Sequence, residues 1–489
     1  MPIEVRRSSV QLLPDSARVL GRPYVPGEEP HAPGQPRLER IVDSVRQLSA
    51  KAIAAELADI QRRFQGRHRD LSLLLTRNGD RAAPLMEGCS DDARTLVGAY
   101  LTQEVAFQAA ALTNPSMVPA PGPASADGSA RFVLSQRAIG EGHLSSITFR
   151  TGSIDARGDV AIDGVSTLAE TGERRGAIHE RRHFAEKVRE LGADIGLTAR
   201  VLDTLPRHFT TEELEGALAV LNDLPPAISR ESDKLLRWLA ASNYLLEFDP
   251  TTTPLAERVL WPEGPFESRG MEDARWVRFS EAGGIDTYYA TYTAYDGFTI
   301  LPQLIETNDF TSFEISTLAG RSALNKGMAL FPRLVDGSYL ALSRPDRENI
   351  HLLRSDDVRA WSQPSSVLRR PRQPWETVQM GNCGSPIETE QGWLVLTHGV
   401  GPMRTYRLGV MLLDLEEPDR ILAELPDPVL ETDDSDRDGY VPNVVYSCGA
   451  MRSGDHLVVP YGVADQRTAF ATFSVPGLLD ALREHPATG

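Results

Sequence analysis

Short runs of β-type residues, separated by turn residues, fill most of the chain from Asn114 onward and constrain its fold more than any other feature. Most are joined by Gly, Asp and Asn turns rather than by crossover helices, which is typical of antiparallel β architecture. The 39 Gly and 34 Pro residues fit a turn-rich chain. So many strands can form radial blades or a sandwich, and the pattern leaves both open. The clearest runs are RFVLSQRAI, LSSITFRTG, ARWVRF, DTYYATYTAY, FTILPQLIET, SYLALSR, GWLVLTHGV, YRLGVMLLDL and HLVVPYGVA.

Two regions have the periodicity of helices instead. Between Leu38 and Phe64 apolar residues recur mostly at three- and four-residue spacing, and a second amphipathic stretch is DDARTLVGAYLTQEVAFQAAAL. We therefore predict a helical region over 36–112. Residues 178–245 also have a helical pattern, with Thr210 and Glu213 forming a capping box. We predict that they form an insertion in a β region that spans 113–480. The first 35 residues are rich in Pro and Gly and lack periodicity, which indicates an extended arm over the surface.

The charge balance limits the possible partners. The chain has 51 Lys and Arg against 68 Asp and Glu, a net charge of −17. Nucleic acid and anionic membranes both favour a basic protein, so we expect neither as a main partner. Three scattered cysteines, without a Cys-x-x-Cys pair, argue against a disulfide framework or a zinc site. No apolar run is long enough for a signal peptide core or a membrane span. We expect a soluble cytoplasmic protein.

A pair of carboxylates at the start of a predicted strand is the first candidate for chemistry. In Gly-Met-Glu-Asp-Ala-Arg, Glu272 and Asp273 point to opposite faces of an extended strand, so one can face a pocket while the other pairs with Arg275. The functional interpretation is a carboxylic acid that protonates a leaving group. The alternative is a solvated turn, where Glu-Asp pairs are common.

Basic residues near strand ends form the second candidate. Lys326 and Arg344 lie on either side of a predicted hairpin, and His398 ends the apolar run WLVLT. Together, such side chains supply the point-charge and bidentate donors that suit a phosphate. Taken singly, Lys326 and Arg344 are better explained as surface charges, and His398 as a structural histidine.

The other motifs give weaker indications of a function. The Gly-Glu-Gly-His segment that ends at His143 lacks the helix and the spacing of a nucleotide loop. Tyr440, Asn443 and Asp465 are polar groups at strand ends, where such residues also close turns. No HExxH, GxSxG or EF-hand pattern occurs, which argues against metallopeptidase, serine hydrolase and calcium-binding functions.

Taken in order, these segments resemble glycoside hydrolase family 130, the β-mannoside phosphorylases and related β-mannosidases. The resemblance spans roughly residues 110–475 and implies a mainly β fold, a five-bladed β-propeller with an N-terminal α-helical extension and a helical insertion. The segments that carry it are TNPS, FVLSQRAIGEGHLSSITFRTG, GMEDAR, NKGMALFP, LSRP, MGNCGSPIETEQGWLVLTHGV, TYRLGVMLLDL, GYVPNVVYSCG and PYGVAD.

The resemblance also implies roles for particular residues. The catalytic acid falls on Asp273, where Ala274 replaces the Pro of the family motif. Another basic position of the family is Gln379 here, which removes one charge from the phosphate site. The phosphate-binding groups are Lys326, Arg344, His398 and Tyr406. The sugar-binding groups are Asn114, Ser116, Arg137 and Asp465, with His143 as a further neighbour.

The implied reaction is inverting phosphorolysis of β-mannosides, with β-1,2-linked mannooligosaccharides favoured. The substrates are then a β-mannooligosaccharide and inorganic phosphate, the products are α-mannose 1-phosphate and a shortened mannoside, and neither a cofactor nor a metal is needed. The alternatives are a β-mannosidase that uses water, a mannosyltransferase on the same scaffold, and a carbohydrate-binding propeller without turnover. The N-terminal helices are candidates for contacts in a homo-oligomer.

Overall fold

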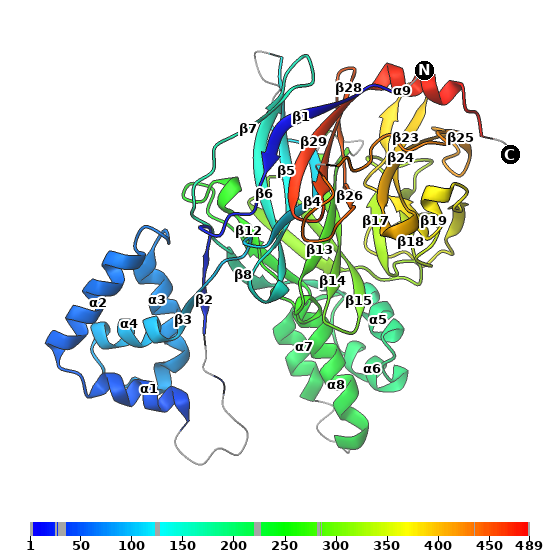
Figure 1. Cartoon of the computed structure of the whole chain (residues 1–489). Helices are drawn as coiled ribbons and strands as arrows, with labels where there is room; N and C mark the ends of the chain where they lie inside the picture. The colour runs from blue at the N-terminus through cyan, green and yellow to red at the C-terminus, as the bar shows by residue number, and fades with distance from the viewer. Residues whose placement is uncertain are drawn as a thin grey trace.

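The computed structural model describes residues 3–24, 27, 36–122, 128–219, 226–280, 284, 286–434 and 436–487 (Figure 1). Antiparallel strands predominate, as the sequence predicts, and they form five large sheets. We number these sheets 1 to 5 by the order of their central strands in the chain. Among the helices in this part of the chain, none is long and apolar enough to cross a membrane.

Each large sheet is built mostly from strands that follow one another in sequence. Sheet 1 contains β4 (Ala111–Pro119), β5 (Ala130–Ile139), β6 (Ser145–Ile154), β7 (Val160–Ile162) and β12 (Val259–Leu260). Sheet 2 contains β8 (Glu173–Gly176), β11 (Tyr244–Glu247), β13 (Met271–Ser280), β14 (Asp286–Tyr295), β15 (Ile300–Thr307) and β16 (Ser312–Thr317). Sheet 3 contains β17 (Lys326–Leu330), β18 (Tyr339–Arg344), β19 (Ile350–Ser355) and β20 (Ser366–Arg369).

Sheets 4 and 5 complete the β region. Sheet 4 contains β21 (Gln379–Asn382), β22 (Ile387–Thr389), β23 (Gly392–Val400), β24 (Tyr406–Leu413) and β25 (Ile421–Glu424). Sheet 5 contains β26 (Val445–Tyr446), β27 (Met451–Ser453), β28 (His456–Val463), β29 (Arg467–Ser474) and, from the other end of the chain, β1 (Val5–Leu12). The helix α9 (Val475–Arg483) follows β29 and packs on the core of sheets 4 and 5.

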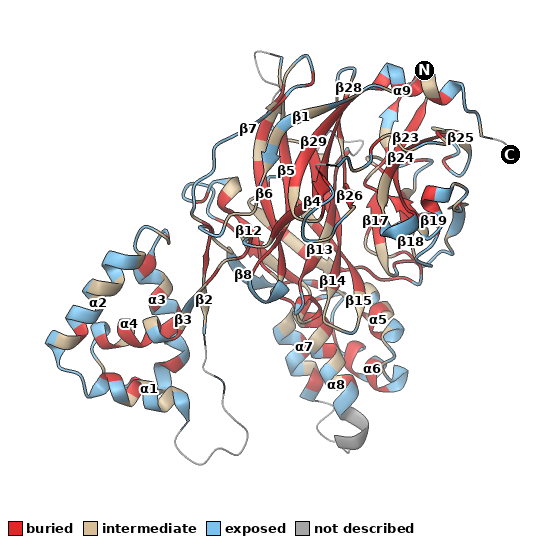
Figure 2. Cartoon of the chain, viewed as in Figure 1, coloured by how far each residue is buried: buried red, intermediate tan, exposed pale blue. Residues whose placement is uncertain are grey.

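Apolar side chains hold consecutive sheets together in a cyclic order. One cluster joins sheets 1 and 2, and further clusters join 2 to 3, 3 to 4, and 4 to 5. A fifth cluster, which includes Phe132 of sheet 1 and Phe470 of sheet 5, joins the last sheet to the first. The strands at these interfaces are buried on both faces over most of their length (Figure 2). This burial explains why many of the β runs are apolar without strict alternation.

The N-terminal segment differs from the predicted surface arm. Its strand β1 pairs with β29, with Val5 opposite Phe473, so the segment is an integral strand of sheet 5. A second strand, β2 (Leu20–Pro23), pairs with β3 (Thr102–Val105). Propensity could not predict either pairing, because the partner strands are distant in sequence. Residues 1–2, 25–26 and 28–35 of the predicted arm lie outside the described residues.

The helical region contains α1 (Arg37–Arg46), α2 (Ala50–Phe64), α3 (Leu71–Gly79) and α4 (Asp91–Tyr100). One apolar cluster joins α1, α2 and α4, and α3 packs beside α4. The prediction of a helix as far as residue 112 is wrong beyond Tyr100. There the chain turns into β3, which pairs with β2, and β4 begins at Ala111. Pairing with a distant strand has overridden the helical pattern of the local sequence.

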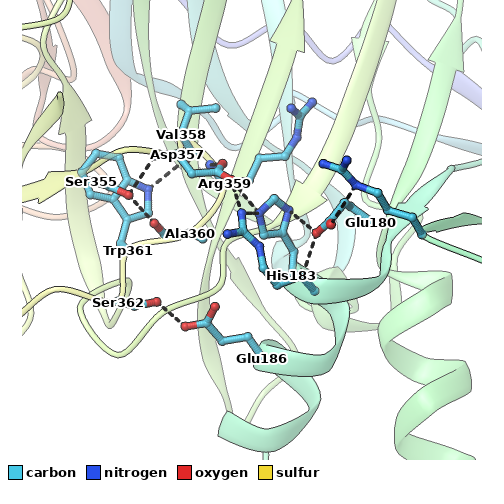
Figure 3. A network of polar contacts seen from close by, with 12 residues as sticks. Glu180, His183, Glu186, Ser355, Asp357, Val358, Arg359, Ala360, Trp361 and Ser362 are labelled. Carbon is cyan, nitrogen blue, oxygen red and sulfur yellow. Dashed lines mark hydrogen bonds and ion pairs between the residues drawn. The ribbon is translucent and has the colours of Figure 1, made fainter. Parts of the chain in front are cut away.

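The insertion predicted over 178–245 contains α5 (Arg181–Glu190), α6 (Ile195–Leu202), α7 (Thr211–Leu218) and α8 (Pro226–Ala241), between β8 and β11 of sheet 2. The predicted capping box is confirmed, since the side chains of Thr210 and Glu213 each accept from the other's backbone N–H. The insertion contacts the β19–β20 connection of sheet 3 through His183, whose Nε2 lies 2.7 Å from Asp357 Oδ2 (Figure 3). The helices are therefore fixed to two adjacent sheets.

Candidate active site

Irregularities in three neighbouring strands place the predicted polar residues. The register shifts between Thr113 and Ser116 in β4, between Glu272 and Arg275 in β13, and between Lys326 and Ala329 in β17. Asn114, Asp273 and Asn325, at or beside these shifts, have φ values of 47°, 57° and 62°. Bulges of this kind re-aim side chains, and left-handed non-glycine residues cluster at functional sites.

Asp273 lies at the centre of this cluster. Asn114 Nδ2 donates a hydrogen bond to its Oδ1, and Arg137 Nη1 lies 3.6 Å from the same atom. Arg275 Nη1 donates to the backbone carbonyl of Asp273 at 3.0 Å. The carboxyl group is therefore held by two residues from sheet 1. The expectation that Glu272 and Asp273 point to opposite faces is wrong, because the Arg137 guanidinium contacts both carboxylates at this bulge.

Opposing effects act on the pKa of Asp273. Burial raises it, but the charges of Arg137, Arg275 and Lys326 and the hydrogen bond from Asn114 lower it, and the pKa is lower than usual. Asp273 is accordingly ionised in the free protein at neutral pH. To act as an acid, it must take up a proton once the surrounding positive charge has been offset.

The cationic residues lie next to Asp273. Lys326 is the direct cross-strand partner of Arg344 in the β17–β18 pair, which confirms the predicted hairpin. Arg344 Nη1 lies 3.3 Å from Nε2 of His398 on β23. Glu272, the neighbour of the candidate acid, accepts from Lys326 Nζ at 2.6 Å and from Arg137 Nη2 at 2.7 Å. One carboxylate thus links a residue of the predicted phosphate site to one of the predicted sugar site.

His398 lies within an aromatic environment. Its ring stacks on Tyr406 at 6.4 Å between centroids and meets the edge of Tyr446 at 4.8 Å. Burial lowers its pKa well below the ordinary value, and the charges of Arg344 and Arg275 add to this effect. His398 is therefore neutral, so Nε2 can accept from Arg344 or donate to an anion, according to its tautomer.

The expectation that Arg275 pairs with Glu272 or Asp273 through a carboxylate is wrong, because its guanidinium bonds backbone carbonyls and a hydroxyl instead. Its Nε donates to the Cys383 carbonyl at 3.0 Å, and its Nη2 lies 2.7 Å from the Tyr446 hydroxyl. Arg275 is almost completely buried and so ties sheet 2 to sheets 4 and 5 directly behind Asp273. Glu272 and Tyr446 were missed in the same way, because their partners lie far away in sequence.

The predicted sugar-binding residues divide into two groups. Asn114, Arg137 and Asp465 lie together around Asp273, with Thr113 Oγ1 within 3.5 Å of Asp465 Oδ1. Ser116, in contrast, accepts from the backbone N–H of Trp276 at 3.0 Å and is completely buried. Its hydroxyl joins β4 to β13, which is a structural role.

His143 and Gln379 occupy separate positions. His143 is exposed after β5, and its Nδ1 lies 2.7 Å from the Tyr440 hydroxyl, so this contact bridges the loops of sheets 1 and 5. Gln379 begins β21 opposite Val400, two residues from the strand position that pairs with His398. Among the described residues, no group of three or more His, Cys, Asp or Glu side chains could hold a metal ion.

A cavity in the helical insertion does not coincide with this cluster. It has a volume of about 570 Å³, lies between α5 and α6, and is lined by residues such as Arg182, Arg189 and Thr198. The predicted site residues do not line it. The site is therefore defined by the convergence of polar side chains on Asp273 and not by cavity size.

Asp465 provides a test of the electrostatics. Burial raises its pKa to about 6, and the charge of Asp273 adds to the increase. A raised pKa means that ionised Asp465 destabilises the fold above about pH 6, and that this effect disappears below the unfolded-state pKa near 4. We predict that Asp465→Asn raises the free energy of unfolding by up to ~3 kcal/mol at pH 7.5 and lowers activity.

Chemical denaturation at pH 7.5 and pH 4 measures this effect. The gain should be present at pH 7.5 and absent at pH 4, while Asp480→Asn, which alters an exposed ion pair with Arg483, should be neutral at both. Equal stability of Asp465→Asn and the wild type at pH 7.5 would show that Asp465 is not destabilised by its surroundings.

Comparison with known proteins identifies the family. A family model described as beta-1,4-mannooligosaccharide phosphorylase matches residues 249–484. The 1,2-beta-oligomannan phosphorylase of Thermoanaerobacter sp. is 35% identical over 219 residues, which cover 43% of this chain and 70% of that protein. The beta-1,2-mannobiose phosphorylase of Listeria innocua is 32% identical over 229 residues, 46% of this chain and 63% of that protein.

A solved structure is also similar. The beta-1,2-mannobiose phosphorylase of Listeria innocua, in complex with beta-1,2-mannobiose, aligns over 78% of this chain and 93% of its own with a TM-score of 0.47 and 22% sequence identity. The relatives that match in sequence are named as phosphorylases of mannosides. The chain belongs to glycoside hydrolase family 130.

Proposed function

We propose that the protein catalyses inverting phosphorolysis of β-mannosides with inorganic phosphate. The proposal is supported by the relatives, which are named as phosphorylases of β-1,2- and β-1,4-linked mannosides and of mannosyl-glucose. We propose β-1,2-linked mannooligosaccharides as substrates, because the relatives at 32 to 35% identity carry β-1,2 names. We also propose that the five sheets, which contact one another in cyclic order, are the blades of a five-bladed propeller.

One observation carries the proposal, which is that Lys326, Arg344 and His398 meet beside the carboxyl group of Asp273. Lys326 and Arg344 are cross-strand partners, and Arg344 contacts His398. A phosphate dianion would find a point charge, a bidentate donor and an imidazole there. Binding phosphate would also require it to compete with Glu272 for Lys326, since that ion pair is present in the free protein.

The mechanism needs one acid and no base. Asp273 donates its proton toward the glycosidic oxygen, directly or through a hydroxyl of the sugar, as the bond from C1 to that oxygen breaks. A phosphate oxygen attacks C1 from the opposite face, so the β-mannoside gives α-mannose 1-phosphate and the shortened mannoside leaves with the proton. An inverting hydrolase instead needs a second carboxylate to activate water, with the two groups about 6.5–9.5 Å apart.

The alternatives differ in how they would use the same residues. In a β-mannosidase, Asp465 is the neighbouring carboxyl group available as a base, because Glu272 is held by Arg137 and Lys326. A mannosyltransferase would need a nucleotide sugar, and a carbohydrate-binding protein would release no product. A screen of β-1,2-, β-1,3- and β-1,4-mannobiose with phosphate separates them. We expect mannose 1-phosphate from the β-1,2 substrate, and its absence from all three would contradict the proposal.

The pH dependence should change with phosphate concentration. Arg137, Arg275 and Lys326 lower the pKa of Asp273 in the free protein, and a bound phosphate dianion offsets positive charge nearby. A higher pKa keeps the acid protonated to higher pH. We predict a shift in the pH profile of kcat/KM for the mannoside. Its descending limb should lie at higher pH when phosphate is saturating than when phosphate is limiting. A limb that does not move would mean that phosphate does not act on Asp273.

A further inference from the structure

Two arginines, one in the segment between β1 and β2 and one on β6 of sheet 1, are buried without a carboxylate partner among the described residues. Arg18, between β1 and β2, is 0% exposed, and Arg150 of β6 is 4% exposed. Neither forms an ion pair with any described residue within 4.0 Å. Moving a cation into a protein interior is costly unless a counter-charge accompanies it. Among the described residues, no carboxylate offsets the charge of either guanidinium group by direct contact.

The contacts of both arginines are with neutral groups. Arg18 donates from Nη1 to Gln108 Oε1 at 3.2 Å and from Nη2 to the Ala256 and Leu168 carbonyls at 2.7 and 3.3 Å. Arg150 Nη1 donates to the Phe149 carbonyl at 2.8 Å. These dipoles stabilise the guanidinium groups but do not offset their charge. The pKa of Arg18 falls to about 10 and that of Arg150 to about 9, mainly through burial, and Arg18 further lowers that of Arg150.

Several buried polar atoms of Arg18 and of residues near the two arginines have no hydrogen-bond partner. Arg18 Nε, Gln108 Nε2 and Thr148 Oγ1 are buried without a hydrogen-bond partner, and all three can donate. Thr148 and Arg150 lie on the same face of β6, because they are two residues apart on one strand. Gln136, whose Oε1 is a buried acceptor without a partner, lies directly opposite Thr148. Buried donors are normally satisfied, so the unpaired donors of Arg18 and Gln108, next to two cations without a counter-charge, favour an anionic acceptor.

We propose that a small inorganic anion, of the size of chloride, binds between Arg18 and Arg150 and accepts hydrogen bonds from the unpaired donors. The negative charge of Asp15 raises the pKa of both arginines, but Asp15 lies too far from them to form an ion pair. An anion supplies the missing counter-charge directly. The binding site does not depend on the proposed phosphorolysis.

The anion would stabilise the junction at which the last sheet meets the first. In the same polar layer, Gln136 Nε2 donates to Thr468 Oγ1 at 2.9 Å, and Thr468 Oγ1 donates to the Leu112 carbonyl at 2.9 Å. Leu112 lies two residues before Asn114, and Thr468 three residues after Asp465. The proposed anion therefore supports the strand ends that carry two of the predicted sugar-binding residues.

Thermal unfolding tests the proposal through mass action. Tm is measured at pH 7.5 in mixtures of sodium chloride and sodium gluconate at constant ionic strength. For the wild type we expect Tm to rise by about 1 °C for each tenfold increase in chloride above the dissociation constant. Arg150→Met should lose this dependence. Arg131→Met, which removes a half-exposed arginine of β5 that pairs with Asp163 just after β7, should keep it.

Bromide provides a direct readout that does not depend on the variants. Crystals of the wild-type protein grown or soaked in sodium bromide should show an anomalous peak in contact with the guanidinium groups of both Arg18 and Arg150. Absence of a peak there at saturating bromide would overturn the proposal, whatever the unfolding data show. If Arg150→Met fails to fold, the bromide experiment on the wild type still decides.

Discussion

Asp273→Asn is expected to lower kcat for β-mannoside phosphorolysis by about 10²- to 10⁴-fold, the usual contribution of a positioned general acid. The amide cannot supply the proton that the leaving oxygen requires. Asn tolerates the left-handed backbone that Asp273 adopts at a φ of 57°, so the bulge in β13 should persist. The variant also removes a negative charge between Asn114 and Arg137, without changing the side-chain volume much.

The measurement is kcat at saturating phosphate and mannoside, with Tm as a test of folding. Asp286→Asn is the matched control, because Asp286 lies in the same sheet at the far end of the β13–β14 pair, where it accepts from Ser280. The control should retain wild-type kcat. Near-normal activity of Asp273→Asn would mean that another group protonates the leaving oxygen, with Asp465 as the first candidate.

Arg344→Ala is expected to raise KM for phosphate roughly 10- to 100-fold while changing KM for the mannoside much less. A hydrogen bond to a charged group contributes about 1.5–3 kcal/mol, and each 1.4 kcal/mol is a factor of ten in affinity. Arg344 is partly buried and its Nε has no partner in the structure, so a donor is available for an anion. Its loss also removes a charge that lowers the pKa of His398.

Initial rates over a matrix of phosphate and mannoside concentrations separate the two KM values. Arg333→Ala is the control, since Arg333 follows β17 at the opposite end of that strand and pairs with Glu388. If Arg344→Ala weakens mannoside binding as much as phosphate binding, Arg344 acts on the whole site, for example through His398, and the phosphate assignment fails.

The sequence was most informative where function depends on local pattern. The hairpin that aligns Lys326 with Arg344 follows from two short β runs and the turn between them, and the capping box of α7 follows from Thr210 and Glu213. The Glu-Asp pair at a strand start marked two candidate carboxylates, and the resemblance to glycoside hydrolase family 130 assigned the acid to Asp273. These features need only the residues next to one another in the chain.

The remaining features depend on contacts between distant segments. Ser116 was predicted to contact the sugar, but it bonds the backbone of β13, 160 residues away in sequence. The pairing of β1 with β29 and the end of α4 at Tyr100 likewise depend on strands from elsewhere in the chain. No periodicity in a single segment contains such information. The same reason explains why the link from Glu272 to both Arg137 and Lys326 was not anticipated.

The strongest link between structure and reaction is the electrostatic coupling of Asp273 to its cationic neighbours. In the free protein, Arg137, Arg275 and Lys326 keep the acid ionised. In this mechanism the phosphate dianion has two roles. It attacks C1, and it offsets the positive charges that oppose protonation of Asp273. Water cannot replace it in this role. The site is thus better suited to phosphorolysis than to hydrolysis.

The measurement that tests this account most directly is product analysis for β-1,2-mannobiose with and without inorganic phosphate. Proton and phosphorus NMR follow the anomeric configuration and the formation of the phosphate ester as the reaction proceeds. The account predicts α-mannose 1-phosphate and one equivalent of mannose with phosphate, and no cleavage without it. Release of two equivalents of free mannose at the same rate in the absence of phosphate would contradict it and would identify a hydrolase.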